Sequence, residues 1–124
     1  RSVPNPATEL MVAYAYDMVQ RVNPLGFFGM VHVLEGTSIN LADKVAGSVR
    51  SALGLEKNAF SYLVSHGSLD QQHVAFFESL MKQIVDEDEQ AVIIHACKMF
   101  YQLYGDIFRT LSAEHKIPRL LKRA

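Results

Sequence analysis

Apolar side chains recur along most of this chain at the three- and four-residue spacing of an α-helix. The pattern predicts five helical runs, which begin near residues 6, 25, 57, 68 and 90 and end near residues 22, 53, 66, 86 and 111. No segment alternates between apolar and polar residues with the period of two that a half-buried strand shows. The sequence therefore predicts an all-α protein.

Residues that start or stop helices mark the ends of the first two runs. Asn5 is placed to cap the first run, with Pro6 at its first helical position. Asn23-Pro24 interrupts the pattern, because proline lacks an N–H donor and disfavours helical backbone in the residue before it. Gly54 closes the second run. Three glycines inside the second run allow a bend or a close helix contact: Gly26, Gly29 and Gly36.

The last run has an acidic start and an apolar stripe. Residues 86–89 (Asp-Glu-Asp-Glu) form a solvated turn that also places negative charge at the helix N-terminus, where the helix dipole favours it. Residues 86–89 lack the spaced oxygen ligands and the glycine of a calcium-binding loop. Five residues at helical spacing are predicted to face a core: Ile93, Cys97, Phe100, Tyr104 and Phe108.

Composition narrows the class of protein. A chain of 124 residues, 49% hydrophobic and with a formal charge of −1, can bury one core, so we expect a single helical-bundle domain over residues 1–124. No basic patch indicates nucleic acid, and the longest nearly uncharged stretch, residues 22–34, is too short to span a membrane. The lone Cys97 and the lack of a secretion signal predict the cytoplasm.

The chain begins with Arg1 and enters a helical pattern directly after residues 3–6 (Val-Pro-Asn-Pro). This start is expected for a chain truncated at its N-terminus. A tag remnant or ordinary processing would produce the same start.

A cluster of ligand-type side chains lies in the third and fourth runs. At about 100° per residue, Asp70 lies about 40° and His73 about 20° from His66 around one continuous helix. The same stripe then becomes apolar at Phe77 and Met81, which indicates an inward face. Imidazole and carboxylate are ligands for iron, manganese and zinc, so the three residues are candidate metal ligands.

A structural interpretation of the same cluster is also open. Gly67 is suited to end one helix, and Ser68-x-x-Gln71 forms a capping box that could start another. Asp70 would then be an ordinary first-turn acid. Asp70 and His73 would still share one face of the second helix.

Glu35 is the fourth candidate ligand. It shares a stripe with Phe28, Val31 and Ile39 and follows His32 by three residues. A carboxylate on an apolar stripe needs a cation or a raised pKa if it is buried. The alternative is that Glu35 reaches water at a kink.

The segments GFFGMVHVLEGTS and SYLVSHGSLDQQHVAFFESLM, with Glu35 and the H-x-x-x-D-x-x-H spacing, resemble the haem-oxygenase-like non-haem di-iron oxidases and oxygenases. This family shares its fold with thiaminase II and the PQQ synthase C enzymes. The resemblance implies a haem-oxygenase-like helical bundle of which this chain is the C-terminal portion. An earlier glutamate, followed seven residues later by a histidine, completes the family's ligand set, and no such pair precedes Glu35 here.

The resemblance implies a site and a function. Glu35 would be a carboxylate ligand that bridges if a second metal is present, His66 and His73 nitrogen ligands, and Asp70 a second carboxylate. The cofactor would be ferrous iron, with two irons in the complete protein and manganese or zinc as substitutes. The partners would be dioxygen, a small-molecule substrate, and a second copy of the chain or the missing N-terminal half. Candidates around the site are His32, Tyr62, His95, Tyr101 and Tyr104.

Three other functions stay open. The same fold could be a metal-free interaction or scaffold bundle in which the polar residues only bond one another. It could be a thiaminase-like enzyme, for which Cys97 is the sole candidate nucleophile. Haem ligation by His95 or His32 is the third alternative, although no feature of the sequence favours it.

Overall fold

The structure is a computed structural model that describes residues 3–114, except for the side chains of residues 40, 43, 63, 64, 66–71 and 112–114. The described backbone is helical and contains no strand, so the all-α prediction is confirmed. The α-helices are α1 (Pro6–Asp17), α2 (Phe27–Leu53), α3 (Ser61–Met81) and α4 (Glu87–Glu114).

The chain divides into two compact units. The α1–α4 unit combines the chain up to Gly29 with the chain from Val92, and the α2–α3 unit is Met30–Ala91. Each unit is described by itself, and the expectation of a single domain stays a prediction. No helix within residues 3–114 is both long enough and apolar enough to cross a membrane.

The start and end of α1 follow the local signals in the sequence. The Asn5 side-chain oxygen accepts a hydrogen bond from the Ala7 N–H at 2.9 Å, and Pro6 occupies the first turn. A short π-helical segment, Met18–Val22, continues α1. The chain then breaks at Asn23, whose side-chain oxygen accepts from the Leu25 N–H at 2.9 Å. Both predicted boundaries are confirmed.

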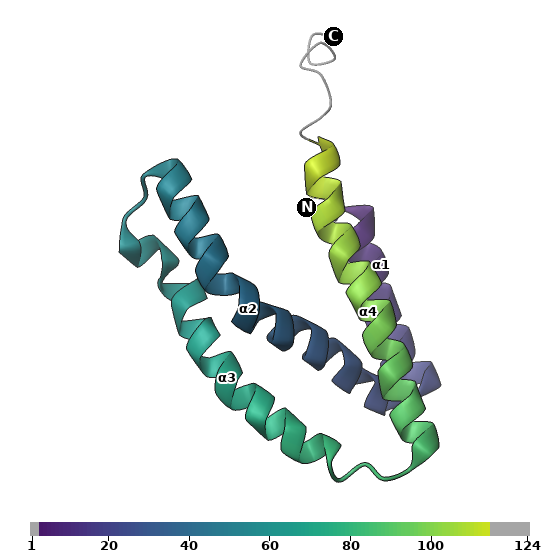
Figure 1. Ribbon diagram of the computed structural model, residues 1–124. Helices are drawn as coiled ribbons and strands as arrows, with labels where there is room; N and C mark the ends of the chain where they lie inside the picture. Colours follow the sequence, from purple (N-terminus) through teal and green to yellow (C-terminus); the bar gives the residue numbers. More distant parts are fainter. Residues whose placement is uncertain (1–2, 115–124) are drawn as a thin grey trace, which may run out of the picture. The chain divides into compact units, whose positions relative to one another are not determined.

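The core of the α1–α4 unit lies where α1 runs beside α4 (Figure 1). The ring of Tyr14 meets the ring of Phe100 edge-on, with 5.0 Å between their centres. Phe100 and Ala96 are fully buried, as is Met18 at the end of the first segment. The start of α2 is also close to α4, because a Cβ atom added at Gly29 would lie 2.6 Å from the Cys97 backbone nitrogen. The predicted close helix contact is therefore present at this glycine.

The predicted core stripe of α4 is confirmed for its centre and wrong at one end. Phe100 is buried, and the residues before and after it on the stripe are half-buried. Phe108 is 52% exposed and meets Tyr104 edge-on with 5.0 Å between ring centres. Helical periodicity identifies a stripe but does not determine how far along the helix a neighbour covers it. Phe108 therefore contacts its own helix instead of a core.

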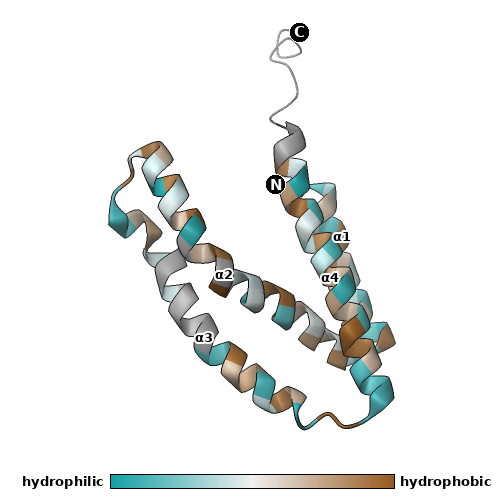
Figure 2. Cartoon of the chain, in the orientation of Figure 1, coloured by the Kyte–Doolittle hydropathy of each residue, from teal (hydrophilic) through white to brown (hydrophobic). Residues whose placement is uncertain are grey.

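The acidic segment places negative charge at the start of α4 as predicted, and Asp86 in addition caps the helix. The Asp86 carboxylate accepts hydrogen bonds from the backbone N–H groups of Asp88 at 2.9 Å and Glu89 at 3.0 Å. Glu87, Asp88 and Glu89 lie in the first turn, where the positive end of the helix dipole favours negative charge. Figure 2 shows this hydrophilic start of α4 in teal.

The α2–α3 unit is a pair of long helices joined through a 3-10 turn, Lys57–Phe60. Gly54 ends α2 with φ +63°, a left-handed conformation that glycine adopts without strain. Within α2 the Thr37 hydroxyl donates to the backbone carbonyls of Val33 and Leu34, a contact that bends helices. Figure 1 shows α2 bent along its length.

The possible break at Gly67-Ser68 does not occur. The α3 helix is continuous over Ser61–Met81, so the predicted third and fourth runs are one helix, which ends at Met81 and not near Asp86. The division of this segment into two runs is therefore wrong, whereas the all-α helical fold class is confirmed. A glycine inside a helix costs about 1 kcal/mol, and a cap contributes a similar amount. Because these two local terms are of similar size, neither by itself decides whether the helix breaks at this point.

Candidate metal centre

A carboxylate and an imidazole meet between the two helices of the α2–α3 unit. Glu35 on α2 and His73 on α3 approach with 3.4 Å between Oε1 and Nδ1. The Glu35 side chain is 28% exposed and the His73 side chain 55% exposed. The structure thus brings together two of the four residues predicted as metal ligands.

The packing of the helices explains why these two residues meet. His32, one turn before Glu35 on α2, places its ring 5.8 Å from the ring of Phe77, one turn after His73 on α3. Advancing along α2 therefore corresponds to going back along α3, as in an antiparallel pair. Val33, next to His32, is fully buried. These contacts hold Glu35 opposite His73.

The other two predicted ligands belong to the same helix. The side chains of His66 and Asp70 lie outside the described residues, so the sequence prediction for them stays a prediction. Because α3 is continuous, the backbone of Asp70 lies about 4.5 Å and that of His66 about 10.5 Å before His73 along the helix axis. Among the side chains that the structure describes, no three histidine, cysteine or acidic residues form a metal-holding group.

The donor chemistry of the Glu35–His73 pair fits iron. One imidazole and one carboxylate, with water or further ligands, is the type of donor set that ferrous iron takes. The separation of 3.4 Å is longer than an ordinary N–H···O hydrogen bond, so neither group is tightly held by the other. Both side chains also retain some exposure, so a cation can reach them.

Within the α2–α3 unit, His32 is the described candidate that lies next to the pair. Tyr62 is 68% exposed and lies three turns before His73 on the same helix. His95, Tyr101 and Tyr104 belong to α4 in the other unit, where His95 and Tyr101 are exposed and Tyr104 packs against Phe108. The geometry within the α2–α3 unit thus supports a role beside the site for His32 alone.

Sequence reasoning missed a hollow beside the pair. The hollow has a volume of about 420 Å³ and lies between α2 and α3. The three- and four-residue spacing along α3 could have indicated one continuous face, but only the position of α2 shows that an open groove lies along this face. Six residues line the hollow: His32, Val74, Phe77, Glu78, Met81 and Lys82.

The other reactive groups show features of structural residues. Burial raises the pKa of the half-buried Cys97 thiol, which reduces the thiolate that a nucleophile needs. This disfavours the thiaminase-like alternative.

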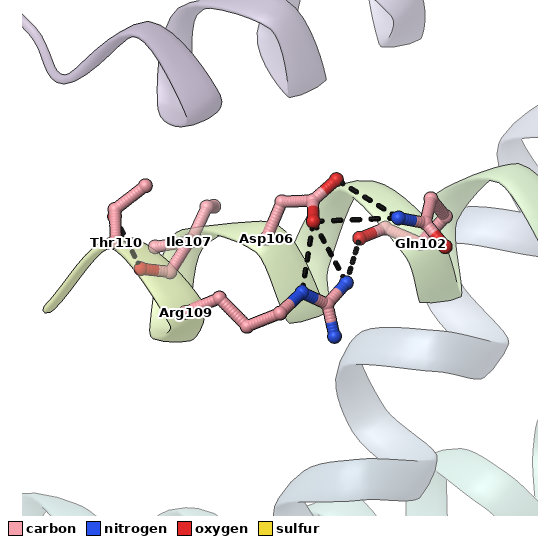
Figure 3. Close-up of polar contacts among 5 residues, drawn as sticks. All are labelled: Gln102, Asp106, Ile107, Arg109 and Thr110. Atoms are coloured by element: carbon pink, nitrogen blue, oxygen red, sulfur yellow. Dashed lines mark hydrogen bonds and ion pairs between the residues drawn. The ribbon is translucent and has the colours of Figure 1, made fainter. Parts of the chain in front are cut away.

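On α4, the Asp106 carboxylate accepts hydrogen bonds from Arg109 Nε at 2.9 Å and from the Gln102 amide at 3.2 Å (Figure 3). The hydrogen bond from Arg109, followed by that from Gln102, lowers the pKa of Asp106. This carboxylate is already paired with a cation and offers no metal site.

Fold and site together define an all-α protein with a carboxylate and imidazole pair placed between antiparallel helices. The sequence model of a haem oxygenase-like family described as an iron-containing redox enzyme matches residues 1–105. The chain therefore belongs to this family of iron-containing redox enzymes. Comparison with curated proteins and with solved structures gives no match.

The family assignment confirms the resemblance at this level and implies iron as the cofactor. Assignment to the di-iron branch, and to the C-terminal portion of a longer bundle, stays a prediction.

Proposed function

We propose that this chain carries part of the metal site of an iron-dependent oxidase or oxygenase that uses dioxygen on a small organic substrate. The observation that carries the proposal is the 3.4 Å approach of Glu35 and His73, in a chain whose family is an iron-containing redox enzyme. A cytoplasmic location is part of the proposal and rests on the lone cysteine.

In this proposal Glu35 and His73 hold one iron, and Asp70 and His66 extend the site along α3. The helical rise of about 10.5 Å between His66 and His73 is large for one ion and suits two neighbouring ions. Glu35 would then bridge them. Manganese or zinc could occupy the same ligands, since both accept imidazole and carboxylate.

Ferrous iron, when bound, supplies the electrons that make dioxygen reactive. The residues of the chain position the metal and the substrate. The carboxylate of Glu35 faces Nδ1 of His73 across 3.4 Å, so the two residues present a carboxylate oxygen and a ring nitrogen to the same space between α2 and α3. The partial exposure of both side chains leaves room for water and for substrate on the open side.

Iron content tests the ligand assignment. We expect His73→Ala and Asp70→Ala each to remove most bound iron while helical content measured by circular dichroism stays unchanged, because neither change removes apolar packing. His95→Ala is the matched control, since His95 is exposed on α4 and has no ligand role here. The measurement is iron per chain after purification without chelator. Unchanged iron in both ligand variants would refute the assignment.

One observation favours a second function, a helical interaction or scaffold bundle. Ile94, Tyr101 and Phe108 are exposed on α4 at seven-residue spacing, the repeat with which helices pack side by side. This stripe supports the proposal that the chain associates with a second copy or with further helices of its own protein. Protein purified without chelator that contains no iron, and that binds none on addition, would favour this second function.

A further inference from the structure

The hollow between α2 and α3 is an open groove with the size of a small-molecule site. Its volume of about 420 Å³ falls within the range of about 300–1,000 Å³ usual for small-molecule pockets. This volume exceeds the about 150 Å³ of an enclosed cavity that holds benzene, so a substituted or fused ring fits in the groove with one side toward solvent. Its floor is apolar and is made by Val74, Phe77 and Met81 of α3.

The walls favour a ring over an alkyl chain. The rings of His32 and Phe77 lie 5.8 Å apart and are tilted by 34°, so they form an aromatic wall shared by both helices. Aromatic rings pack on one another in offset or edge-on arrangements, which contribute free energy beyond that of burying their apolar surface. Lys82 on the rim adds a cation, which is attracted to the face of a ring.

The rim does not select a charged ligand. Glu78 on α3 and Lys82 directly after its end both line the hollow, are exposed, and lie four residues apart with opposite charges. The two charges cancel, so the rim attracts neither an anion nor a cation strongly. An uncharged part of a ligand fits this lining best.

We propose that this hollow binds an uncharged aromatic ring of the substrate. That this ligand is the substrate rests on the function proposed above. His32 precedes Glu35 by one turn, and Val74 follows His73 directly, so the hollow adjoins the proposed iron ligands. A ring held there would lie beside the metal site.

A neutral naphthalene fluorophore, prodan, tests the proposal in metal-free chain. Its emission shifts to the blue in an apolar site, so a titration gives a Kd without any activity. We expect Phe77→Leu to weaken prodan binding by about three- to tenfold, because the leucine keeps bulk but loses the ring contact. Phe76→Leu is the matched control, since Phe76 is 64% exposed and does not line the hollow. Val74→Trp should fill the hollow and abolish binding.

A competition experiment distinguishes binding of aromatic rings from binding of alkyl chains. We expect 2-naphthol to displace prodan at concentrations where decan-1-ol does not. Equal loss of affinity in Phe76→Leu and Phe77→Leu, no prodan binding by the unaltered chain, or equal displacement by the alcohol would overturn the proposal. Circular dichroism of each variant shows whether it is folded. These results are independent of iron, whereas the proposed function is tested by the iron content of the unaltered chain and of His73→Ala and Asp70→Ala, so the two failures are distinguishable.

Discussion

Replacing Gly29 by alanine should destabilise the α1–α4 unit. An added Cβ atom would lie 2.6 Å from the Cys97 backbone nitrogen and 2.8 Å from the Ala96 Cβ atom. Separations below 3.0 Å require something to move, and the atoms met here are mostly helix backbone, which cannot rotate away. Overpacking of this kind costs up to about 3 kcal/mol.

The net effect is smaller because alanine favours a helix. Relative to glycine, alanine gains about 1 kcal/mol inside a helix, so the expected net loss is about 2 kcal/mol. Gly47, in the same helix α2, is the matched control, because a Cβ atom added there meets nothing within 4 Å. Gly47→Ala should therefore stabilise the chain by about 0.5–1 kcal/mol.

Thermal unfolding followed by circular dichroism compares the two variants. For a chain of this length about 1 kcal/mol corresponds to roughly 4 °C in Tm. Gly29→Ala should lower Tm by roughly 8 °C, and Gly47→Ala should raise it by roughly 2–4 °C. If both variants raise Tm, the close approach of α2 to α4 at Gly29 is wrong.

Two further predictions concern α4. Because burial raises the pKa of the Cys97 thiol, we expect iodoacetamide to label the folded chain at pH 7.5 more slowly than the urea-unfolded chain, with the difference falling as the pH rises; equal rates would contradict the burial of this thiol. Because Tyr101 is an exposed apolar residue at the centre of its stripe, we expect the sedimentation coefficient of the chain to rise with concentration and Tyr101→Lys to weaken this rise, while His95→Lys has little effect. A monomer at every concentration would contradict the proposed association.

Much of the fold could be predicted because its signals are local. Helical periodicity, the Asn5 and Asp86 caps, the break at Asn23-Pro24 and the left-handed Gly54 all depend on residues a few positions apart. Such signals act through hydrogen bonds and backbone preferences that short segments carry by themselves.

Other features could not be decided from local helix signals alone. The sequence left open whether Gly67-Ser68 divides a helix, and in the structure α3 runs through these residues without a break. The stripe of α4 was apolar to its end, yet Phe108 is exposed. A periodic pattern cannot tell which part of a helix acquires a neighbour.

The sequence by itself determined that Glu35 and His73 carry ligand chemistry on helical stripes. Only the tertiary structure brought them within 3.4 Å of each other and formed the hollow beside them. Both depend on how α2 and α3 pack against each other in antiparallel register. That register is set by contacts between residues far apart in the chain, such as His32 with Phe77, which no local pattern encodes.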